Sequence, residues 1–205
     1  MTAHAPALTP LRLALVGVPN RGKTALFNRL TGSRQKVANY AGVTVERKEG
    51  SFTGPSRQRQ YRVLDLPGAY SLTPTTLDEA ITRDFLLGRL AGEPAPEFVV
   101  CVVDATNLWL NLRLVLELRD VGVPMIVALN MSDLARGRGY RLDRERLQQE
   151  IGVPGVETVA VEQGGHRKLL EALEGIATPG MRPASEGREP TFEQIQETQR
   201  EARRI

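Results

Sequence analysis

The chain has 205 residues, and its 27 basic and 24 acidic side chains give a formal net charge of +3 at pH 7. This length suits one α/β domain with a short appendage. The charge is too small to indicate a nucleic-acid partner, so none is expected. The single cysteine, Cys101, lies in an apolar run, which predicts a buried thiol and excludes a disulfide framework within the chain.

No targeting or membrane-spanning segment is visible in the sequence. Residues 1–10 have neither a basic segment nor an apolar core, so they are not a signal peptide, and we expect a flexible N-terminus. No apolar run approaches the roughly 20 residues of a membrane-spanning helix. We therefore expect a soluble, monomeric chain, and its end within an apparent helix favours a fragment of a larger protein.

In chain order, apolar runs that predict strands alternate with stretches that predict helices. The expected strands lie near 11–16, 61–65, 98–103, 124–129 and 156–161, and the expected helices near 23–31, 78–90, 108–120, 141–151 and 165–176. This alternation is typical of a mostly parallel sheet with helices on both faces. The weaker alternation of 46–53 predicts an antiparallel edge strand paired with 61–65.

The C-terminal part predicts a linker and one further helix. Residues 178–190 are rich in proline, glycine and charge, as linkers are. Thr191 can then cap a helix over 191–205, with Gln194 as its capping-box partner. This helix has few apolar residues and would be marginal in isolation. The expected organisation is therefore a domain over 11–177, a linker over 178–190 and a C-terminal helix over 191–205.

Residues 17–24 read G-V-P-N-R-G-K-T between the first expected strand and the first expected helix, which is the context that a P-loop requires. Backbone N–H groups and the helix start form an anion cradle there. Lys23 can reach the β- and γ-phosphates of a nucleotide, and the Thr24 hydroxyl can bind Mg²⁺. The expected cradle comprises Gly17, Val18, Pro19, Asn20, Arg21, Gly22, Lys23, Thr24 and Ala25.

Three further motifs follow, each near a strand end. Thr44, within Gly42-Val43-Thr44, can close over the γ-phosphate and bind Mg²⁺. In Asp65-Leu-Pro-Gly68, the acid suits Mg²⁺ and the Gly68 N–H can bond the γ-phosphate. Asn130-Met131-Ser-Asp133 places a carboxylate that can accept two hydrogen bonds from guanine, whereas adenine offers no such donor pair. Taken singly, these are also a strand threonine, a turn and an Asx turn, but their order favours a guanine-nucleotide site.

This order resembles the translation-factor-like P-loop GTPases. Over about 11–175, the chain resembles the cytosolic G domain of the bacterial ferrous iron transporter family FeoB. The resemblance is carried by the sequences N-Y-A-G-V-T-V-E-R-K-E-G, D-L-P-G-A-Y-S-L and N-M-S-D. The resemblance implies a three-layer Ras-like α/β fold that binds and hydrolyses GTP with Mg²⁺. It also implies a membrane-embedded permease part of the same protein, at the cytoplasmic face of the bacterial inner membrane. The C-terminal helix would then be a shortened or truncated helical domain that leads to that part.

The chain departs from its relatives at several positions. Ras-like enzymes have a water-orienting glutamine where Ala69 stands, so slow intrinsic hydrolysis is expected. The resemblance implies that Asn20 helps to bind K⁺ beside the phosphates, the alternative being a residue that only stabilises the loop. The family commonly has Trp-Pro where this chain has Tyr40-Ala41. In the fifth motif, Val159-Ala160-Val161 stands where the family is expected to have Ser-Ala or Ser-Thr. A backbone N–H of Ala160 or Val161 can still contact the guanine oxygen, but the missing serine hydroxyl predicts a mobile loop and faster nucleotide release.

The sequence leaves two alternative functions open. An RNA- or ribosome-associated GTPase would require an added RNA-binding domain or a strongly basic face, and the sequence shows neither. A slow nucleotide-binding regulatory module fits the absent glutamine and the atypical fifth motif. The leading interpretation is a potassium-stimulated GTPase, with Lys23, Thr44, Asn20 and Gly68 as catalytic groups.

Overall fold

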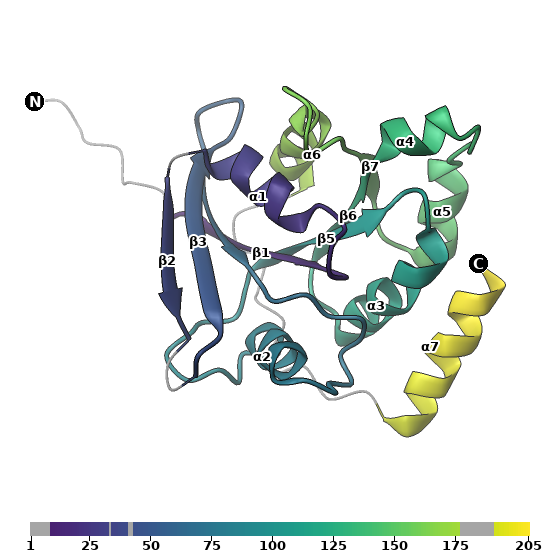
Figure 1. Ribbon diagram of the computed structural model, residues 1–205, viewed down its shortest axis with the longest axis horizontal. Coiled ribbons are helices and arrows are strands. Elements are labelled where there is room, and N and C mark those ends of the chain that lie inside the picture. Colours follow the sequence, from purple (N-terminus) through teal and green to yellow (C-terminus); the bar gives the residue numbers. More distant parts are fainter. Residues whose placement is uncertain (1–8, 33, 41–42, 177–190) are drawn as a thin grey trace, which may run out of the picture.

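The computed structural model describes residues 9–32, 34–40, 43–176 and 191–205, arranged around a central sheet (Figure 1). Seven strands follow the order β2-β3-β4-β1-β5-β6-β7. They are β1 (Leu11–Gly17), β2 (Gln35–Asn39), β3 (Glu46–Thr53), β4 (Gln60–Asp65), β5 (Phe98–Asp104), β6 (Met125–Asn130) and β7 (Gly155–Glu157). The five strands from β4 to β7 in the sheet are parallel, and β3 runs antiparallel to both β2 and β4. The expected mostly parallel sheet with an antiparallel edge is confirmed.

Helices cover both faces of the sheet. The helices are α1 (Lys23–Thr31), α2 (Leu77–Leu86), α3 (Leu108–Val121), α4 (Ser132–Gly137), α5 (Arg144–Ile151), α6 (Arg167–Ile176) and α7 (Phe192–Arg204). Buried side chains of α1 and α6 pack on one face, and those of α2, α3 and α5 pack on the other. Figure 1 shows α1 and α6 above the sheet, with α2 and α3 below it. The three-layer architecture is therefore also confirmed.

The apolar strands are buried on both faces, which explains why the sequence shows them as continuous hydrophobic runs. In β5, Val100 and Val102 belong to the core under α1 and α6, whereas Val99 and Cys101 belong to the core under α2 and α3. Side chains alternate between the two faces because successive residues of a strand point in opposite directions. Burial raises the pKa of the Cys101 thiol to about 12, so this cysteine serves as a small apolar side chain.

The structure corrects several expected elements. The outermost strand, β2, and the short helix α4 were not predicted. The strand expected over 156–161 is only the three-residue β7, since Thr158 and Ala160 leave the sheet to bond with Asn130. Polar β2 shows no apolar period because four of its five side chains are exposed. Residues 1–8 and the linker expected over 178–190 lie outside the described residues.

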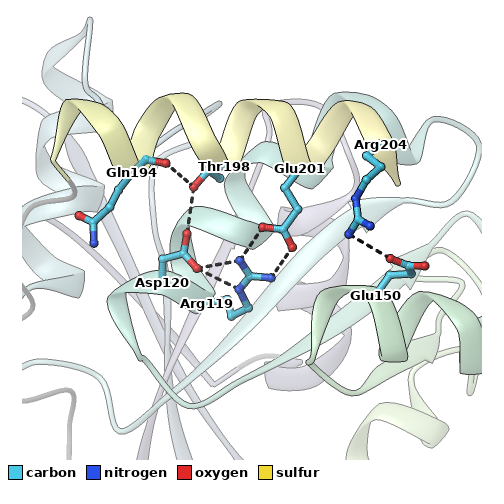
Figure 2. Close-up of polar contacts among 7 residues, drawn as sticks. All are labelled: Arg119, Asp120, Glu150, Gln194, Thr198, Glu201 and Arg204. Atoms are coloured by element: carbon cyan, nitrogen blue, oxygen red, sulfur yellow. Dashed lines mark hydrogen bonds and ion pairs between the residues drawn. The ribbon is translucent and has the colours of Figure 1, made fainter.

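Helix α7 lies along α3, and polar contacts hold it there (Figure 2). The predicted capping box of Thr191 and Gln194 is confirmed. The Arg119 guanidinium of α3 donates to both Glu201 oxygens, at 2.8 and 2.9 Å. The Thr198 hydroxyl donates to Asp120 at 2.9 Å, and Arg204 forms an ion pair with Glu150 of α5. These contacts explain how a helix with few apolar residues is held against the domain.

Two classes of feature are absent from the part of the chain that the structure describes. None of its helices combines the length and the apolar character needed to cross a bilayer. Its histidine, cysteine, aspartate and glutamate side chains form no group of three or more that could hold a metal ion.

Candidate functional site

The loop between β1 and α1 packs closely against the ends of the neighbouring strands. Gly22 has a φ of 83°, and a Cβ placed there would lie 2.2 Å from the Asn130 amide nitrogen. A Cβ at Gly17 would lie 2.5 Å from the Val102 carbonyl oxygen. Any larger residue would therefore displace the loop, and at Gly22 it would also adopt a strained backbone conformation. The sequence uses glycine at the two positions where a P-loop must fold tightly.

The side chains of Lys23 and Thr24 converge on Asp65. The Lys23 ammonium forms an ion pair with one Asp65 oxygen, and the Thr24 hydroxyl donates to the other at 3.0 Å. Asp65 is only 6% exposed, so its charge requires such partners. Strands β1 and β4 are parallel neighbours that end at the same edge of the sheet, which brings the first and third motifs together.

Thr44 lines the same cavity as this cluster. The cavity has a volume of about 510 Å³, and its lining includes Lys23, Thr24, Thr44 and Asp65. Two hydroxyls and a carboxylate are oxygen ligands of the kind that Mg²⁺ prefers. The residues present therefore fit a magnesium site beside a phosphate cradle. Val43 bonds through its N–H to the Tyr40 carbonyl at 3.2 Å, whereas Gly42 lies outside the described residues.

The segment after Asp65 runs against the P-loop. The Ala69 N–H donates to the Gly17 carbonyl at 3.2 Å, and a Cβ at Gly68 would meet the Pro19 ring at 2.6 Å. Ala69 is fully buried, and its methyl side chain has no polar atom that could orient a water as a glutamine would. The structure thus brings Gly68 to the P-loop, as the sequence predicted.

Side chains that the sequence did not single out hold this segment in place. The Leu72 N–H donates to Glu117 of α3, and the Tyr70 N–H donates to Glu79 of α2 at 3.2 Å. The Thr82 hydroxyl donates to the Pro67 carbonyl at 2.8 Å. The pKa of Glu79 lies below its ordinary value. Burial alone would raise this pKa, but the hydrogen bonds from the N–H groups of Thr75 and Tyr70 stabilise the charged carboxylate and outweigh the effect of burial. Acids on helices carry no sequence pattern that would have revealed these contacts.

Asn130 connects the fourth motif to both the P-loop and the fifth motif. Its amide NH₂ group donates to the Arg21 carbonyl at 3.0 Å, and its amide oxygen accepts from the Ala160 N–H at 2.9 Å. Asn130 is 2% exposed, so both contacts are shielded from water. This side chain therefore links the P-loop to the segment that contains Ala160.

Met131 and Asp133 follow Asn130 at the start of α4. Met131 has a φ of 59° and precedes the helix, and Asp133 lies in the first helical turn. Asp133 is half-buried, and within the described ranges its carboxylate forms no hydrogen bond or ion pair. The Ala160 N–H is bonded to Asn130, whereas the Val161 N–H forms no hydrogen bond within the described residues. Val161 itself is 72% exposed.

The positions of two more P-loop residues bear on the expected ion sites. Arg21 forms an ion pair at 2.8 Å with Asp104, a buried residue at the end of β5, so its side chain is anchored away from Asp65. Asn20 is exposed and has a φ of 61°, a conformation that asparagine tolerates better than most residues. The loop-stabilising explanation of Asn20 and the K⁺ explanation are both compatible with this geometry.

Comparison with known proteins gives one consistent family. A profile of the family described as ferrous iron transport protein B matches residues 11–173. The Fe(2+) transporter FeoB of Escherichia coli (strain K12) is 45% identical over 168 residues, which cover 80% of this chain and 21% of that protein. The same protein of Salmonella typhimurium (strain LT2) gives the same identity and coverage. The chain spans about a fifth of the length of these curated relatives.

Solved structures of the same family have the same fold. The cytosolic domain of the T. maritima FeoB iron transporter in its GMPPNP form has a TM-score of 0.76 at 40% identity, covering 83% of this chain and 65% of that one. Its GDP form I has a TM-score of 0.77 at 39% identity, covering 86% and 67%. The FeoB G domain of Methanococcus jannaschii has a TM-score of 0.69 at 36% identity and covers 82% and 98%.

Proposed function

The chain belongs to the ferrous iron transport protein B family, and from this membership we propose that it is the GTP-binding and GTP-hydrolysing domain of a ferrous iron uptake protein. One observation carries the proposal: Lys23, Thr24, Thr44 and Asp65 line one cavity beside the P-loop. GDP and GMPPNP forms of the T. maritima relative support a guanine nucleotide as the ligand.

In the proposed binding mode, the P-loop binds the phosphates and the region around Asp133 binds the base. The phosphates lie over the backbone N–H groups of the P-loop, where a helix N-terminus favours anions. The Lys23 ammonium then moves from Asp65 to the β- and γ-phosphates. Guanine lies against Asp133, whose unpaired carboxylate accepts from the ring N–H and the exocyclic amine. The Val161 N–H donates to the guanine oxygen.

In the proposed reaction, water attacks the γ-phosphorus and the bond to the β–γ bridging oxygen breaks, which yields GDP and phosphate. The Lys23 ammonium and the Gly68 N–H stabilise the negative charge on the phosphoryl oxygens. Thr24, Thr44 and Asp65 would hold Mg²⁺, which supplies further positive charge when bound. Asn20 would hold K⁺, which supplies charge where other GTPases use an arginine. Ala69 provides no side chain to orient the water, so the intrinsic rate is slow.

The remaining parts of the proposal concern the whole protein. We propose that the domain works at the cytoplasmic face of the bacterial inner membrane, beside a membrane-embedded permease part of the same protein. The division into a domain over 11–177, a linker over 178–190 and a helix over 191–205 belongs to this proposal. No feature of the described residues favours RNA over a guanine nucleotide.

Exchange of Asp133 tests the base assignment. Asp133→Asn replaces one acceptor of the carboxylate by a donor, so GTP should bind more weakly by roughly 2 to 4 kcal/mol, and xanthosine triphosphate should bind more tightly than in wild type. Titrations of GTP, XTP and ATP measure this change. Glu145→Gln, at an exposed position of α5, removes the same charge and should alter none of the affinities.

Two results would reject parts of the proposal. Equal GTP affinity in wild type and Asp133→Asn would remove the fourth motif from the base site. Tight, selective GTP binding without phosphate release over many hours would favour the slow regulatory module over the GTPase. Phosphate release measured with excess GTP distinguishes the GTPase from the regulatory module.

A further inference from the structure

Arg29 of α1 contacts the fifth-motif loop through two hydrogen bonds. Its Nε donates to the Ala160 carbonyl oxygen at 3.2 Å, and its Nη2 donates to the Val161 carbonyl oxygen. The partners are separated by 131 and 132 positions in the sequence. One guanidinium therefore holds two consecutive carbonyls of the segment that follows β7, in the fork geometry that arginine alone provides.

These two carbonyls determine how the loop presents its N–H groups. The Ala160 carbonyl and the Val161 N–H belong to the same planar trans peptide and point in opposite directions. When Arg29 holds the carbonyl, the Val161 N–H must point away from Arg29. The Ala160 N–H is already directed at the Asn130 amide oxygen. The two contacts together fix both peptide planes that flank Ala160.

The same loop lies beside the fourth motif. The Ser132 hydroxyl donates to the Thr158 carbonyl at 3.2 Å, next to Asp133 in the chain. Further along, Val159 and Gly165 close the loop through an N–H to carbonyl bond of 2.9 Å. A base held by Asp133 would therefore meet the segment whose orientation Arg29 controls. Among the described residues, Arg29 is the only hydrogen-bond donor to the Val161 carbonyl, and Val161 as a whole is 72% exposed.

We propose that Arg29 is a positioning residue for the nucleotide base, which holds the Val161 N–H toward the guanine oxygen and slows nucleotide release. This inference rests on the proposed function, because it requires guanine to occupy the site beside Asp133. Arg29 thereby supplies the restraint that the missing hydroxyl of the fifth motif does not. The effect is moderate because the Arg29 side chain is exposed and its charge is screened.

The test compares two nucleotides that differ only at the base oxygen. In 6-thio-GDP, sulfur replaces that oxygen and is a weaker hydrogen-bond acceptor, whereas the donors that face Asp133 remain. Dissociation constants and release rates are measured by competition with a fluorescent GDP analogue. Arg29→Gln should speed GDP release about tenfold and speed 6-thio-GDP release by less than about threefold.

Two further variants separate geometry from charge. Arg29→Lys keeps the positive charge but loses the fork, so it should release GDP nearly as fast as Arg29→Gln. Arg34 lines a surface pocket together with Arg29 but forms no side-chain hydrogen bond to the loop, so Arg34→Gln removes a nearby positive charge and should change release by less than about twofold. Thermal unfolding of each variant without nucleotide shows whether the fold is retained.

The possible outcomes are distinct. Equal acceleration for both nucleotides would make Arg29 a structural tie between α1 and the loop, and would overturn the inference. Unchanged GDP release would overturn it as well. If wild type binds no guanine nucleotide, or if Asp133→Asn leaves guanine selectivity intact, the proposed function itself fails, which titrations of wild type and Asp133→Asn show before any Arg29 variant is used.

Discussion

Asn20 can be explained by its backbone conformation or by the proposed K⁺ site. Its φ of 61° lies in the left-handed region, where asparagine is several-fold enriched, so backbone geometry alone accounts for this residue. The K⁺ role requires in addition that its amide oxygen binds a cation. A test must therefore remove the side chain without straining the backbone. Glycine does this, whereas alanine would add a cost of about 1 to 2 kcal/mol.

We predict that Asn20→Gly abolishes stimulation by K⁺. Wild type should hydrolyse GTP faster in KCl than in NaCl at equal ionic strength, which controls for general screening. The variant should be equally slow in both salts and should keep nearly the same GDP affinity, because the cation acts on the triphosphate state. If wild type shows no difference between the salts, Asn20 only shapes the loop.

Thr44 is exposed at the edge of the cavity, and it forms no hydrogen bond within the described parts of the chain. We therefore predict that Thr44→Ala folds and binds GDP like wild type but hydrolyses GTP at least about tenfold more slowly, because Thr44 engages only with Mg²⁺ and the γ-phosphate. Single-turnover phosphate release measures this. Thr53→Ala, at an exposed strand end, is the matched control, and full turnover in Thr44→Ala would assign closure of the site to another residue.

At the scale of elements, α3 supports the segment that carries Gly68. Glu117 of α3 is 1% exposed, accepts from the Leu72 N–H and pairs with Arg113 at 2.8 Å. We predict that Glu117→Leu lowers the free energy of unfolding by about 1 to 3 kcal/mol, because the Leu72 N–H loses its buried acceptor. Glu117→Gln retains an acceptor and should cost less. Urea unfolding of both variants tests this order, and a larger loss in Glu117→Gln would contradict it.

The contact between α3 and α7 should depend on pH. Hydrogen bonds from Arg119 lower the pKa of Glu201 below its ordinary 4.5, so protonation of Glu201 opposes the docked state. Docking is therefore fully supported above pH 4.5 and weakens as the pH falls through the lowered pKa. Trp109 lines a groove with Gln199, Ala202 and Arg203 of α7, so its fluorescence reports the change. Glu201→Gln should lack this step, and an identical step in that variant would assign it to another group.

Trp109 lies at the surface and not in the core. Its side chain is 64% exposed, although it is the single tryptophan of the chain. Trp109 lies in the first turn of α3, one turn before Leu112, whose side chain belongs to the core. The Trp109 side chain faces the groove beside α7 instead. This exposure is what makes the residue usable as a probe.

At the scale of the whole molecule, a ligand that joins the P-loop, Asp65 and the fourth motif should stabilise the fold. GDP with Mg²⁺ at 100 times its dissociation constant should add about 2.7 kcal/mol, which raises the melting temperature by roughly 5 to 11 °C for a chain of this size. Thermal scans with GDP, ADP and XDP test this. Wild type should respond to GDP and Asp133→Asn to XDP, and an equal response of wild type to ADP would contradict the base selectivity.

The chemistry of the P-loop was readable from the sequence because it is local. A buried strand, a glycine-containing loop and a helix start follow one another over about 20 residues, and the parallel βα alternation places the later motifs at the same edge of the sheet. Thus Lys23, Thr24, Thr44, Asp65 and Gly68 could be named, and the structure brings them together. The capping box of Thr191 is local in the same sense.

Only the tertiary structure decided which distant groups support that site. Arg29 meets Ala160 across 131 positions, Asn130 meets Arg21 across 109, and Glu117 meets Leu72 across 45. Each pairing depends on how helices pack on the sheet, and no residue pattern at either end records its partner. The same holds for polar β2, whose pairing with β3 comes from backbone hydrogen bonds, and for α7, which the Arg119 fork holds against α3. Local order therefore determined the motifs of the candidate nucleotide site, and packing determined which distant groups position them.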